Sequence, residues 1–248
     1  MGILNVTPDS FADGGKHNDF EAAIARGLEM IAEGVDIIDI GGESTRPGAD
    51  RVGEEEEIAR TIPVIAELAK HGTPISIDTM RATTAEAAIK AGASIINDVS
   101  GGLADSEMLQ TAARLQVPYI AMHWRGQSKD MNSKAVYEDV VSDVISELYE
   151  RIEAALDAGI QKDKLIIDPG LGFAKDAEHN WAIIDSIDQF VALGYPVLVG
   201  GSRKRFLGGD TPDEREEATI QLTKRLGTTG VWAVRVHSVK PHKEVLSS

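Results

Sequence analysis

Apolar and polar residues follow two different rhythms along the chain. Short aliphatic runs are followed by longer stretches in which apolar residues recur every three or four positions, and this unit repeats eight times. The first rhythm is typical of buried parallel strands, and the second of helices that cover a sheet. We expect strands at residues 2–6, 35–40, 74–78, 94–97, 117–122, 164–168, 196–199 and 231–236. Eight such units predict a (β/α)8 TIM barrel of the α/β class.

Helices are expected between these strands, among them residues 19–33, 54–70, 82–91, 133–158 and 177–193. In the stretch 133–158 the apolar residues fall at intervals of four, which predicts a face packed on the barrel. These residues are Val136, Val140, Val144, Leu148, Ile152 and Leu156. Glycines at positions 34, 92, 159 and 194 each follow an expected helix, where a left-handed cap residue is wanted.

The competing architecture is an open, doubly wound sheet. Such sheets commonly carry a G-x-G-x-x-G segment after the first strand, and this chain has none there. Its 248 residues are close to the roughly 250 of one closed barrel, so we expect a single domain over residues 1–248. The first expected strand starts at Gly2 and only a short helix can follow the eighth, so shortened terminal elements are expected.

Composition narrows the class of protein. Hydrophobic residues make up 42% of the chain but aromatic residues only 5%, so the core must be aliphatic. The absence of cysteine excludes disulfides and thiolate chemistry, and it fits a reducing compartment. A formal charge of −15 argues against a nucleic-acid partner, since phosphate backbones demand basic surfaces. No apolar run reaches the roughly 18 residues of a membrane span, so we expect a cytoplasmic protein without membrane contact.

Polar residues stand at the carboxyl ends of the expected strands, where barrels of this kind carry their active sites. Taken singly, each has a structural explanation: Asp98 could cap a helix, His123 could be a satisfied core residue, and Glu43 could pair with an arginine. Those explanations do not account for Asp78 and Asp168, which end aliphatic strands although a buried carboxylate is costly without hydrogen-bond donors.

Two carboxylates beside the amide of Asn97 favour a ligand rich in N–H donors. A planar nitrogen heterocycle with an amino group next to a ring N–H fits, because one carboxylate accepts both donors in parallel. Lys204 could bind a carbonyl oxygen of the same ring. A set of basic residues then follows strands two, seven and eight: Arg46, Arg203, Lys204, Arg235 and His237. It indicates an anion pocket, although these cations could instead neutralise nearby acids.

Two loops, residues 7–16 and 43–51, are rich in Gly, Ser, Thr and Pro and longer than usual strand-to-helix connections. Loops of this kind often close over substrate, with Phe11 and Pro47 as the apolar contacts here. Neither carries a Walker-type phosphate motif, which argues against a nucleotide kinase.

Seven segments resemble the signature segments of the dihydropteroate synthase family, in the order of that family and across essentially the whole chain. They are NVTPDSF at 5–11, GESTRPG at 42–48, SIDT at 76–79, INDVSGG at 96–102, DPG at 168–170 with Gly172 and Phe173, SRK at 202–204 and RVH at 235–237. The resemblance implies that 4-aminobenzoate displaces diphosphate from (7,8-dihydropterin-6-yl)methyl diphosphate, which gives 7,8-dihydropteroate in folate biosynthesis. Sulfonamides would then compete with 4-aminobenzoate.

The resemblance also implies roles for individual residues. Asp78, Asn97, Asp168 and Lys204 would hold the pterin, Arg235 would stack on the ring, and Met122 and Phe173 would also bind substrate. Arg235, His237 and Thr45 would bind the diphosphate, with Asn5 contributing to a Mg2+ site. Phe11, Asp13, Thr45, Arg46 and Pro47 would complete the aminobenzoate site beside Ser202 and Lys204. Lys204, Arg235, His237 and Asp13 would be the catalytic residues of an SN1-like displacement, in a protein that is expected to be a homodimer.

Two alternatives share this pattern in part. A pterin-binding methyltransferase on the same barrel would use acids such as Asp78, Asn97 and Asp168, but it would not need Lys204, Arg235 and His237 around a diphosphate. A non-catalytic paralogue that binds pterin would be expected to lose the Ser-Arg-Lys segment or the closing loops, and both are present. The chain departs from the family at Gly201, where a larger residue is expected before Ser202.

Overall fold

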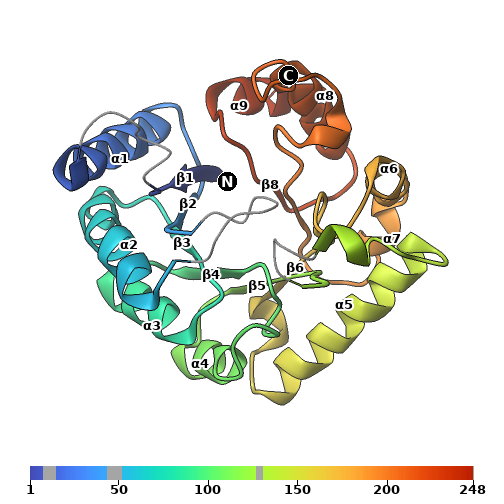
Figure 1. Ribbon diagram of the computed structural model, residues 1–248, viewed down its shortest axis with the longest axis horizontal. Coiled ribbons are helices and arrows are strands. Elements are labelled where there is room, and N and C mark those ends of the chain that lie inside the picture. The colour runs from blue at the N-terminus through green and yellow to red at the C-terminus, as the bar shows by residue number, and fades with distance from the viewer. Residues whose placement is uncertain (8–14, 44–51, 127–130, 248) are drawn as a thin grey trace.

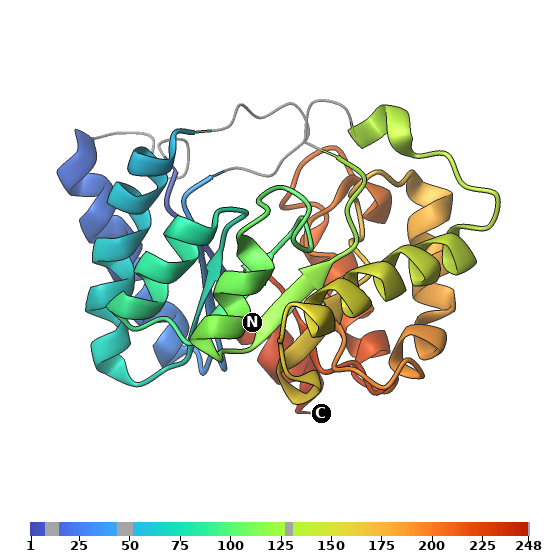
Figure 2. The ribbon, with the colours of Figure 1, turned by 90° about the horizontal axis from the view of Figure 1, so that it is seen from below.

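The computed structural model describes residues 1–7, 15–43, 52–126 and 131–247. Its strands lie inside a ring of helices (Figure 1), as expected for a (β/α)8 barrel. The side view places both termini at the end of the barrel from which the strands start (Figure 2). In the described ranges, no helix combines the length and apolar character that a membrane span requires.

Strands and helices alternate along the described chain. The strands are β1 (Gly2–Asn5), β2 (Ile38–Gly41), β3 (Ile75–Asp78), β4 (Ile95–Asp98), β5 (Tyr119–Met122), β6 (Leu165–Asp168), β7 (Leu198–Val199) and β8 (Ala233–Val234). The helices are α1 (Gly15–Ala32), α2 (Glu54–Leu68), α3 (Ala82–Ala91), α4 (Met108–Leu115), α5 (Val140–Asp157), α6 (Ala177–Asp185), α7 (Ile187–Val191), α8 (Glu216–Leu226) and α9 (Lys240–Leu246). Short 3-10 turns span Ala69–His71, Met131–Lys134, Lys162–Lys164 and Arg205–Leu207.

The strands form two parallel sheets that are joined into one ring. Strands β1 to β6 pair in sequence order, and β7 pairs with β8. A single bridge between Ile167 and Val197 links β6 to the β7 side, and another between Gly2 and Val236 links β1 to the β8 side. At the second seam Ile3 N donates to Val236 O at 2.8 Å, and Val236 N donates to Met1 O at 3.0 Å. The expected barrel is therefore closed, and both seams are narrow.

Side-chain alternation divides the buried residues into two layers. One small cluster fills the inside of the barrel near the strand starts, and it consists of Met1, Ile37, Ile95, Ile120, Ile166 and Leu198, with Ala233 packed against it. The larger cluster lies between strands and helices and includes Ile38, Ile40, Ile96 and Ile167. Because successive side chains of a strand point to opposite faces, residues two positions beyond the inner cluster also point inward.

Several predicted boundaries were wrong. The helix expected over residues 133–158 begins only at Val140, because the Asp139 side chain accepts hydrogen bonds from Val141 N and Ser142 N at 3.0 Å and caps it there. Val136 therefore lies outside the helix and is 76% exposed, and Leu156 is 37% exposed. Intervals of four drift about 40° per step on a helix of 3.6 residues per turn, so one face cannot hold the entire stripe. The middle four residues of the stripe, from Val140 to Ile152, are buried as predicted.

The helix expected over residues 177–193 is two helices, since Ser186 leaves the helical conformation between α6 and α7. The expected strands are in the right places but begin one to three residues early in most cases, as at residues 35, 94 and 117. The four glycines expected as left-handed caps do have positive φ, for example 116° at Gly92 after α3.

A buried acid at the end of β4 stabilises the barrel wall. Both oxygens of Asp98, which is 0% exposed, accept hydrogen bonds: Oδ1 from Ser100 N and Oγ, and Oδ2 from Gly102 N and the Tyr119 hydroxyl at 2.7 Å. The helix cap that was one explanation from sequence is therefore wrong in detail, since Asp98 binds the turn at residues 100–102 and α4 begins only at Met108.

We expect the Tyr119→Phe substitution to lower the free energy of unfolding by about 1–3 kcal/mol, because it leaves a buried carboxylate oxygen with one donor fewer. Urea denaturation at pH 7 measures this loss. The matched control is Tyr149→Phe, since Tyr149 is 45% exposed, and its effect should stay within about 0.5 kcal/mol. Equal stability of the two variants would contradict the assigned role of the Tyr119 hydroxyl.

Candidate active site

A ring of side chains, polar except for Met122, points into the barrel directly above the inner apolar cluster. Each lies two residues beyond a member of that cluster: Asp39 after Ile37, Asn97 after Ile95, Met122 after Ile120, Asp168 after Ile166 and Arg235 after Ala233. Asp78 ends β3 in register with Asn97. The alternation of the strands therefore brings acids, an amide and a guanidinium to the carboxyl end of one barrel.

Arg235, which follows β8, connects the acids of β2 and β3. Its Nε donates to Asp39 Oδ2 at 2.6 Å, and its second terminal nitrogen donates to Asp78 Oδ2 at 2.6 Å. Asn97 Nδ2 donates to the same oxygen of Asp39 at 3.1 Å. Burial raises the pKa of Asp78 to about 7, although the Arg235 guanidinium opposes this rise. Burial alone would lower the pKa of Arg235, but Asp39 and Asp78 outweigh that effect and raise it.

Asp39 is the residue of this group that the sequence analysis missed. It lies within β2 rather than at a strand end, is 0% exposed, and its Oδ1 has no hydrogen-bond partner among the described residues. Its signal is the spacing Ile37-x-Asp39 in an aliphatic strand, because a strand that points Ile37 inward also points Asp39 inward. The two buried carboxylates, those of Asp39 and Asp78, require a compensating cation, and the Arg235 guanidinium supplies it.

Asp168 and Lys204 form the opposite wall. Asp168 is 5% exposed, and its Oδ1 accepts from Gly170 N at 2.7 Å. The Lys204 ammonium donates to Leu171 O and lies 4.5 Å from the centre of the Phe173 ring. Burial lowers the pKa of Lys204 to about 8 while the Asp168 carboxylate opposes this, and burial raises the pKa of Asp168. A side chain at Gly172 would meet Lys204 Cδ at 2.7 Å, so glycine there makes room for the lysine.

Ser202 and His237 meet at the seam between the strand-seven and strand-eight loops. His237 N donates to Ser202 Oγ at 3.2 Å, and that oxygen lies 2.9 Å from His237 Nδ1. The hydroxyl can then donate to Nδ1 only if the proton of the neutral imidazole is on Nε2. Arg203 belongs elsewhere, since its Nε donates to Glu216 at 2.5 Å and its φ is 56°. The alternative explanation from sequence, a cation that neutralises a nearby acid, therefore holds for Arg203.

Two adjacent glycines after β7 have different roles. A Cβ at Gly201 would lie 2.7 Å from Leu222 Cδ2 of α8, so the larger residue expected there would collide with the helix. A Cβ at Gly200 would lie 3.7 Å from Asp168 Oδ2 and 4.0 Å from Arg235 Cβ. Glycine at position 200 therefore keeps a space open between the Asp168 carboxylate and Arg235.

Five of the predicted site residues, Phe11, Asp13, Thr45, Arg46 and Pro47, lie outside the described residues. Arg81 binds the described residues at both ends of the loop expected at residues 43–51. It donates to Glu43 Oε2 at 2.9 Å and to Val52 O at 2.6 Å, and it also pairs with Glu57. Glu43 thus has the arginine partner expected from sequence, and the same arginine also reaches Val52, which was not expected.

The predicted Mg2+ ligand, Asn5, is half-buried at the carboxyl end of β1 and pairs with Gly41 across the sheet. In the described part of the chain, no three His, Asp or Glu side chains gather as a metal cluster. An amide oxygen is a ligand that Mg2+ accepts, and this ion usually completes its shell with water and substrate phosphates. The residues present thus fit a substrate-bound Mg2+ rather than an ion held by protein groups alone.

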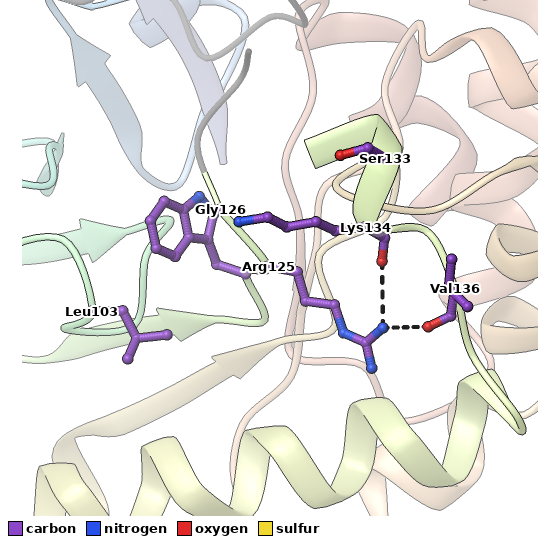
Figure 3. Close-up of a pocket in the computed structure, with 7 residues that line it drawn as sticks. Leu103, Arg125, Gly126, Ser133, Lys134 and Val136 are labelled. Carbon is purple, nitrogen blue, oxygen red and sulfur yellow. Dashed lines mark hydrogen bonds between the residues drawn. The ribbon is translucent and has the colours of Figure 1, made fainter. Parts of the chain in front are cut away.

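A cavity of about 800 Å³ lies after β5, lined by Leu103, Trp124, Arg125, Gly126, Ser133, Lys134 and Val136 (Figure 3). Arg125 faces it, but its guanidinium is engaged with Val136 O at 2.6 Å and with both oxygens of Glu147. The inward-pointing acids and Lys204 do not line this cavity. We therefore place the candidate site at the barrel mouth.

Comparisons with known proteins agree with this geometry. The family model described as pterin binding enzyme matches residues 1–237. The chain is 46% identical to dihydropteroate synthase of Mycobacterium leprae (strain TN) over 256 residues, which covers 99% of this chain and 90% of the relative. The structure of Xanthomonas albilineans dihydropteroate synthase with 4-aminobenzoic acid superimposes with a TM-score of 0.94 at 44% identity, covering 100% of this chain and 90% of that one. The enzyme of the same organism in complex with 7,8-dihydropteroate gives a TM-score of 0.90 at 40% identity, with the same coverages.

A pterin-binding enzyme of the TIM-barrel type is therefore the class that fold and site define. More specifically, the chain belongs to the dihydropteroate synthase family, whose members are transferases of folate biosynthesis.

The ion pairs of Arg235 yield a prediction about stability. We expect Arg235→Met to lower the free energy of unfolding by about 3 kcal/mol at pH 8, because Asp39 and Asp78 lose their shared cation. The loss should shrink toward pH 5. The pKa of Asp78 is about 7 in the folded protein although Arg235 opposes the rise, and without Arg235 it lies higher still, above the unfolded value of about 3.9. The folded variant therefore takes up a proton on Asp78 at pH 5, and the stability that this proton gives is lost as pH rises through the folded pKa. Urea denaturation at the two pH values tests this, with exposed Arg114→Met as the control; a loss independent of pH would contradict the buried-charge explanation.

Proposed function

We propose that the site described above condenses (7,8-dihydropterin-6-yl)methyl diphosphate with 4-aminobenzoate, releasing diphosphate and 7,8-dihydropteroate, and that its residues act as follows. The roles are assigned from one observation: the barrel mouth has hydrogen-bond acceptors on one side and cations on the other. Buried acceptors on β3, β4 and β6 face cations from the loops after β7 and β8. That division matches a ligand with N–H donors at one end and a charged leaving group at the other.

Asp168 binds the donor edge of the pterin. Its Oδ1 already accepts from Gly170 N, and its Oδ2 faces the space that glycine leaves at position 200. An ionised carboxylate placed in this way accepts the 2-amino group and the ring N–H in parallel. Asp78 Oδ2 accepts a hydrogen bond from Arg235, so Asp78 Oδ1 is the atom that accepts from a further N–H of the pterin ring. Lys204, whose ammonium lies over the Phe173 ring, donates to the carbonyl oxygen of the pterin.

Arg235 and His237 stabilise the charge that develops on the departing diphosphate. The guanidinium is anchored by Asp39 through Nε and by Asp78 through one terminal nitrogen, so the other terminal nitrogen is the one that we propose donates to the diphosphate. The Ser202 hydroxyl orients His237 so that Nε2–H points away from that contact. Preorganised donors of this kind act where charge appears in the transition state. Asn5 would help hold Mg2+, which, when bound with the diphosphate, neutralises leaving-group charge.

The departing bond is the C–O bond between the pterin methylene and the diphosphate. In an SN1-like course it breaks before the amine attacks, and the electron-rich pterin carries the positive charge while Asp78 and Asp168 face the ring. The amino nitrogen of 4-aminobenzoate then forms the new C–N bond and loses one proton. Ser202 and Lys204 lie on the side from which we propose that it attacks, with Phe11, Asp13, Thr45, Arg46 and Pro47 completing that subsite. No step requires a protein nucleophile, which suits a chain without cysteine.

We also propose that the protein acts in the cytoplasm and as a homodimer. The cysteine-free composition supports a reducing compartment. Family membership supports the dimer, and sedimentation of the purified chain decides it.

The function is tested by following diphosphate release with both substrates, with and without Mg2+. We expect turnover that requires both substrates and the metal. Lys204→Ala should lower kcat/KM by about 100-fold or more, since a charge-assisted donor to the ring is lost. The control is Lys224→Ala, an exposed lysine of α8. Tight pterin binding without turnover in the wild type would instead favour a non-catalytic paralogue.

The pKa values of two site residues predict a bell-shaped pH dependence of kcat/KM for the pterin diphosphate. Asp78 must be ionised to accept, so activity should fall as pH drops below about 7, where it takes up a proton. Lys204 must be charged to donate, so activity should fall again as pH rises above about 8. Lys204→Arg should remove the alkaline fall while retaining the acid one. A flat profile between pH 6 and 9 would refute both assignments.

A further inference from the structure

A buried lysine, Lys175, lies behind the wall that carries Asp168. It is 8% exposed and follows the loop that leaves β6. Its Nζ donates to Gly170 O and to Phe173 O, both at 3.1 Å, and lies 2.8 Å from His123 Nδ1. An ammonium group has three donors, and these three acceptors match them.

The protonation of His123 follows from its partners. Burial alone would raise the pKa of Glu147, but hydrogen bonds from His123 and Arg125 lower it to about 2, so this carboxylate is ionised. It therefore accepts at His123 Nε2, at 2.9 Å. Burial lowers the pKa of His123 to about 4, so the ring is neutral and its Nδ1 carries a lone pair. Lys175 is thus the donor in the contact with Nδ1.

The backbone between Asp168 and Lys175 is bent into an unusual shape. Three of its residues have positive φ: Gly170 at 69°, Gly172 at 75° and Ala174 at 48°. For alanine this conformation is uncommon and is kept only where the surroundings enforce it. Two lysines hold the loop from opposite sides, because Lys204 binds Leu171 O on the substrate side while Lys175 binds the carbonyls on either side of it. The Tyr137 hydroxyl adds a bond to Ala174 O at 2.9 Å.

The charges around Lys175 come from four elements. Glu147 of α5 and Arg125 after β5 form a pair with each other at the far side of His123. Asp168 of β6 and Lys204 after β7 lie on the substrate side. Burial lowers the pKa of Lys175 to about 7, and the Asp168 carboxylate is the largest influence that opposes this fall. Lys175 and Asp168 therefore stabilise each other's charged forms.

We propose that Lys175 is a positioning residue of this site, which fixes the loop behind Asp168 and places a positive charge beneath its carboxylate. The loop fixes Gly170 N against Asp168 Oδ1 and Phe173 against Lys204, so the pterin meets two prealigned groups. The positive charge adds to those of Lys204 and Arg235 in favouring the ionised form of Asp168, and only the ionised form accepts two N–H donors. This inference rests on the proposed binding of a pterin by Asp168.

The test is the affinity for 6-hydroxymethylpterin, which carries the heterocycle without the diphosphate, measured by calorimetry from pH 5.5 to 8. The Lys175→Met substitution keeps a long, unbranched side chain but removes its charge. With Asp78→Asn in both proteins, so that the acid limb reports Asp168 alone, we expect binding at pH 6.5 to weaken at least tenfold and the acid limb to move to higher pH, because loss of a neighbouring cation raises the pKa of the Asp168 carboxyl. KM for 4-aminobenzoate should stay close to that of the wild type. An acid limb in its wild-type position would overturn the proposal.

The matched control is Lys162→Met, which makes the same change at an exposed lysine just before β6 begins. It should bind and turn over as the wild type does. If wild type and control neither bind the pterin nor release diphosphate, the proposed function fails. If both behave as expected and the limb of the Lys175→Met variant does not move, only the inference about Lys175 fails.

A chemical rescue separates charge from packing, and the absence of other cysteines makes it specific. Lys175→Cys is alkylated in denaturant and refolded, with 2-bromoethylamine to restore an ammonium or with 1-bromopropane to restore only length. We expect the aminoethyl form to recover pterin affinity and the wild-type acid limb, and the propyl form to recover neither. Equal recovery in both forms, or refolding of neither, would make Lys175 a packing residue and refute the positioning role.

Discussion

The guanidinium of Arg235, shared by the carboxylates of Asp39 and Asp78, is the contact around which the barrel mouth is organised. Each acid alone would be costly inside the barrel, since both are nearly inaccessible to water. The shared cation compensates both and lets two acids remain at the top of an aliphatic core. It also ties β8 to β2 and β3 across the mouth. The chemistry of the site and the stability of its walls thus depend on one side chain.

Around this centre, several residues act through the backbone rather than by facing the barrel mouth. Gly172 makes room for Lys204, Gly201 lets α8 approach the loop after β7, and Lys175 binds carbonyls of the loop behind Asp168. Arg203 is turned away from the mouth, and its pairing with Glu216 joins the loop after β7 to α8. Residues of one short motif, such as Ser202, Arg203 and Lys204, therefore serve different purposes although they are adjacent in sequence.

Much of this arrangement could be predicted from the sequence because it follows from local periodicity. Aliphatic runs give the strands, and polar residues at their ends give Asp78, Asn97, Asp168 and Lys204. The missed residue, Asp39, lies inside β2, two residues before the strand ends. Only its alternation with the inward-pointing Ile37 indicates the direction of its side chain. Partnerships between distant segments carry no local signal. Arg235 is 196 residues from Asp39 and Lys175 is 52 residues from His123, so only the folded barrel shows these pairs.

Element ends were the least predictable feature, for a physical reason. The start of α5 depends on one capping side chain, Asp139, and apolar spacing alone placed it several residues too early. The departure at Gly201 likewise has a cause that sequence does not display, since the obstacle is Leu222 on another element.

The two seams of the barrel give the site a mechanical property. The acids belong to the six-stranded sheet, whereas Lys204, Arg235 and His237 follow the two-stranded one, and each seam between the sheets contains a single bridge. A molecule bound at the mouth by both groups spans the seams and works as a removable cross-link between two sheets. Its occupancy would therefore suppress local opening at the amides of Ile3, Ile167 and Val236, so that slower hydrogen exchange there would be a signature of a filled site.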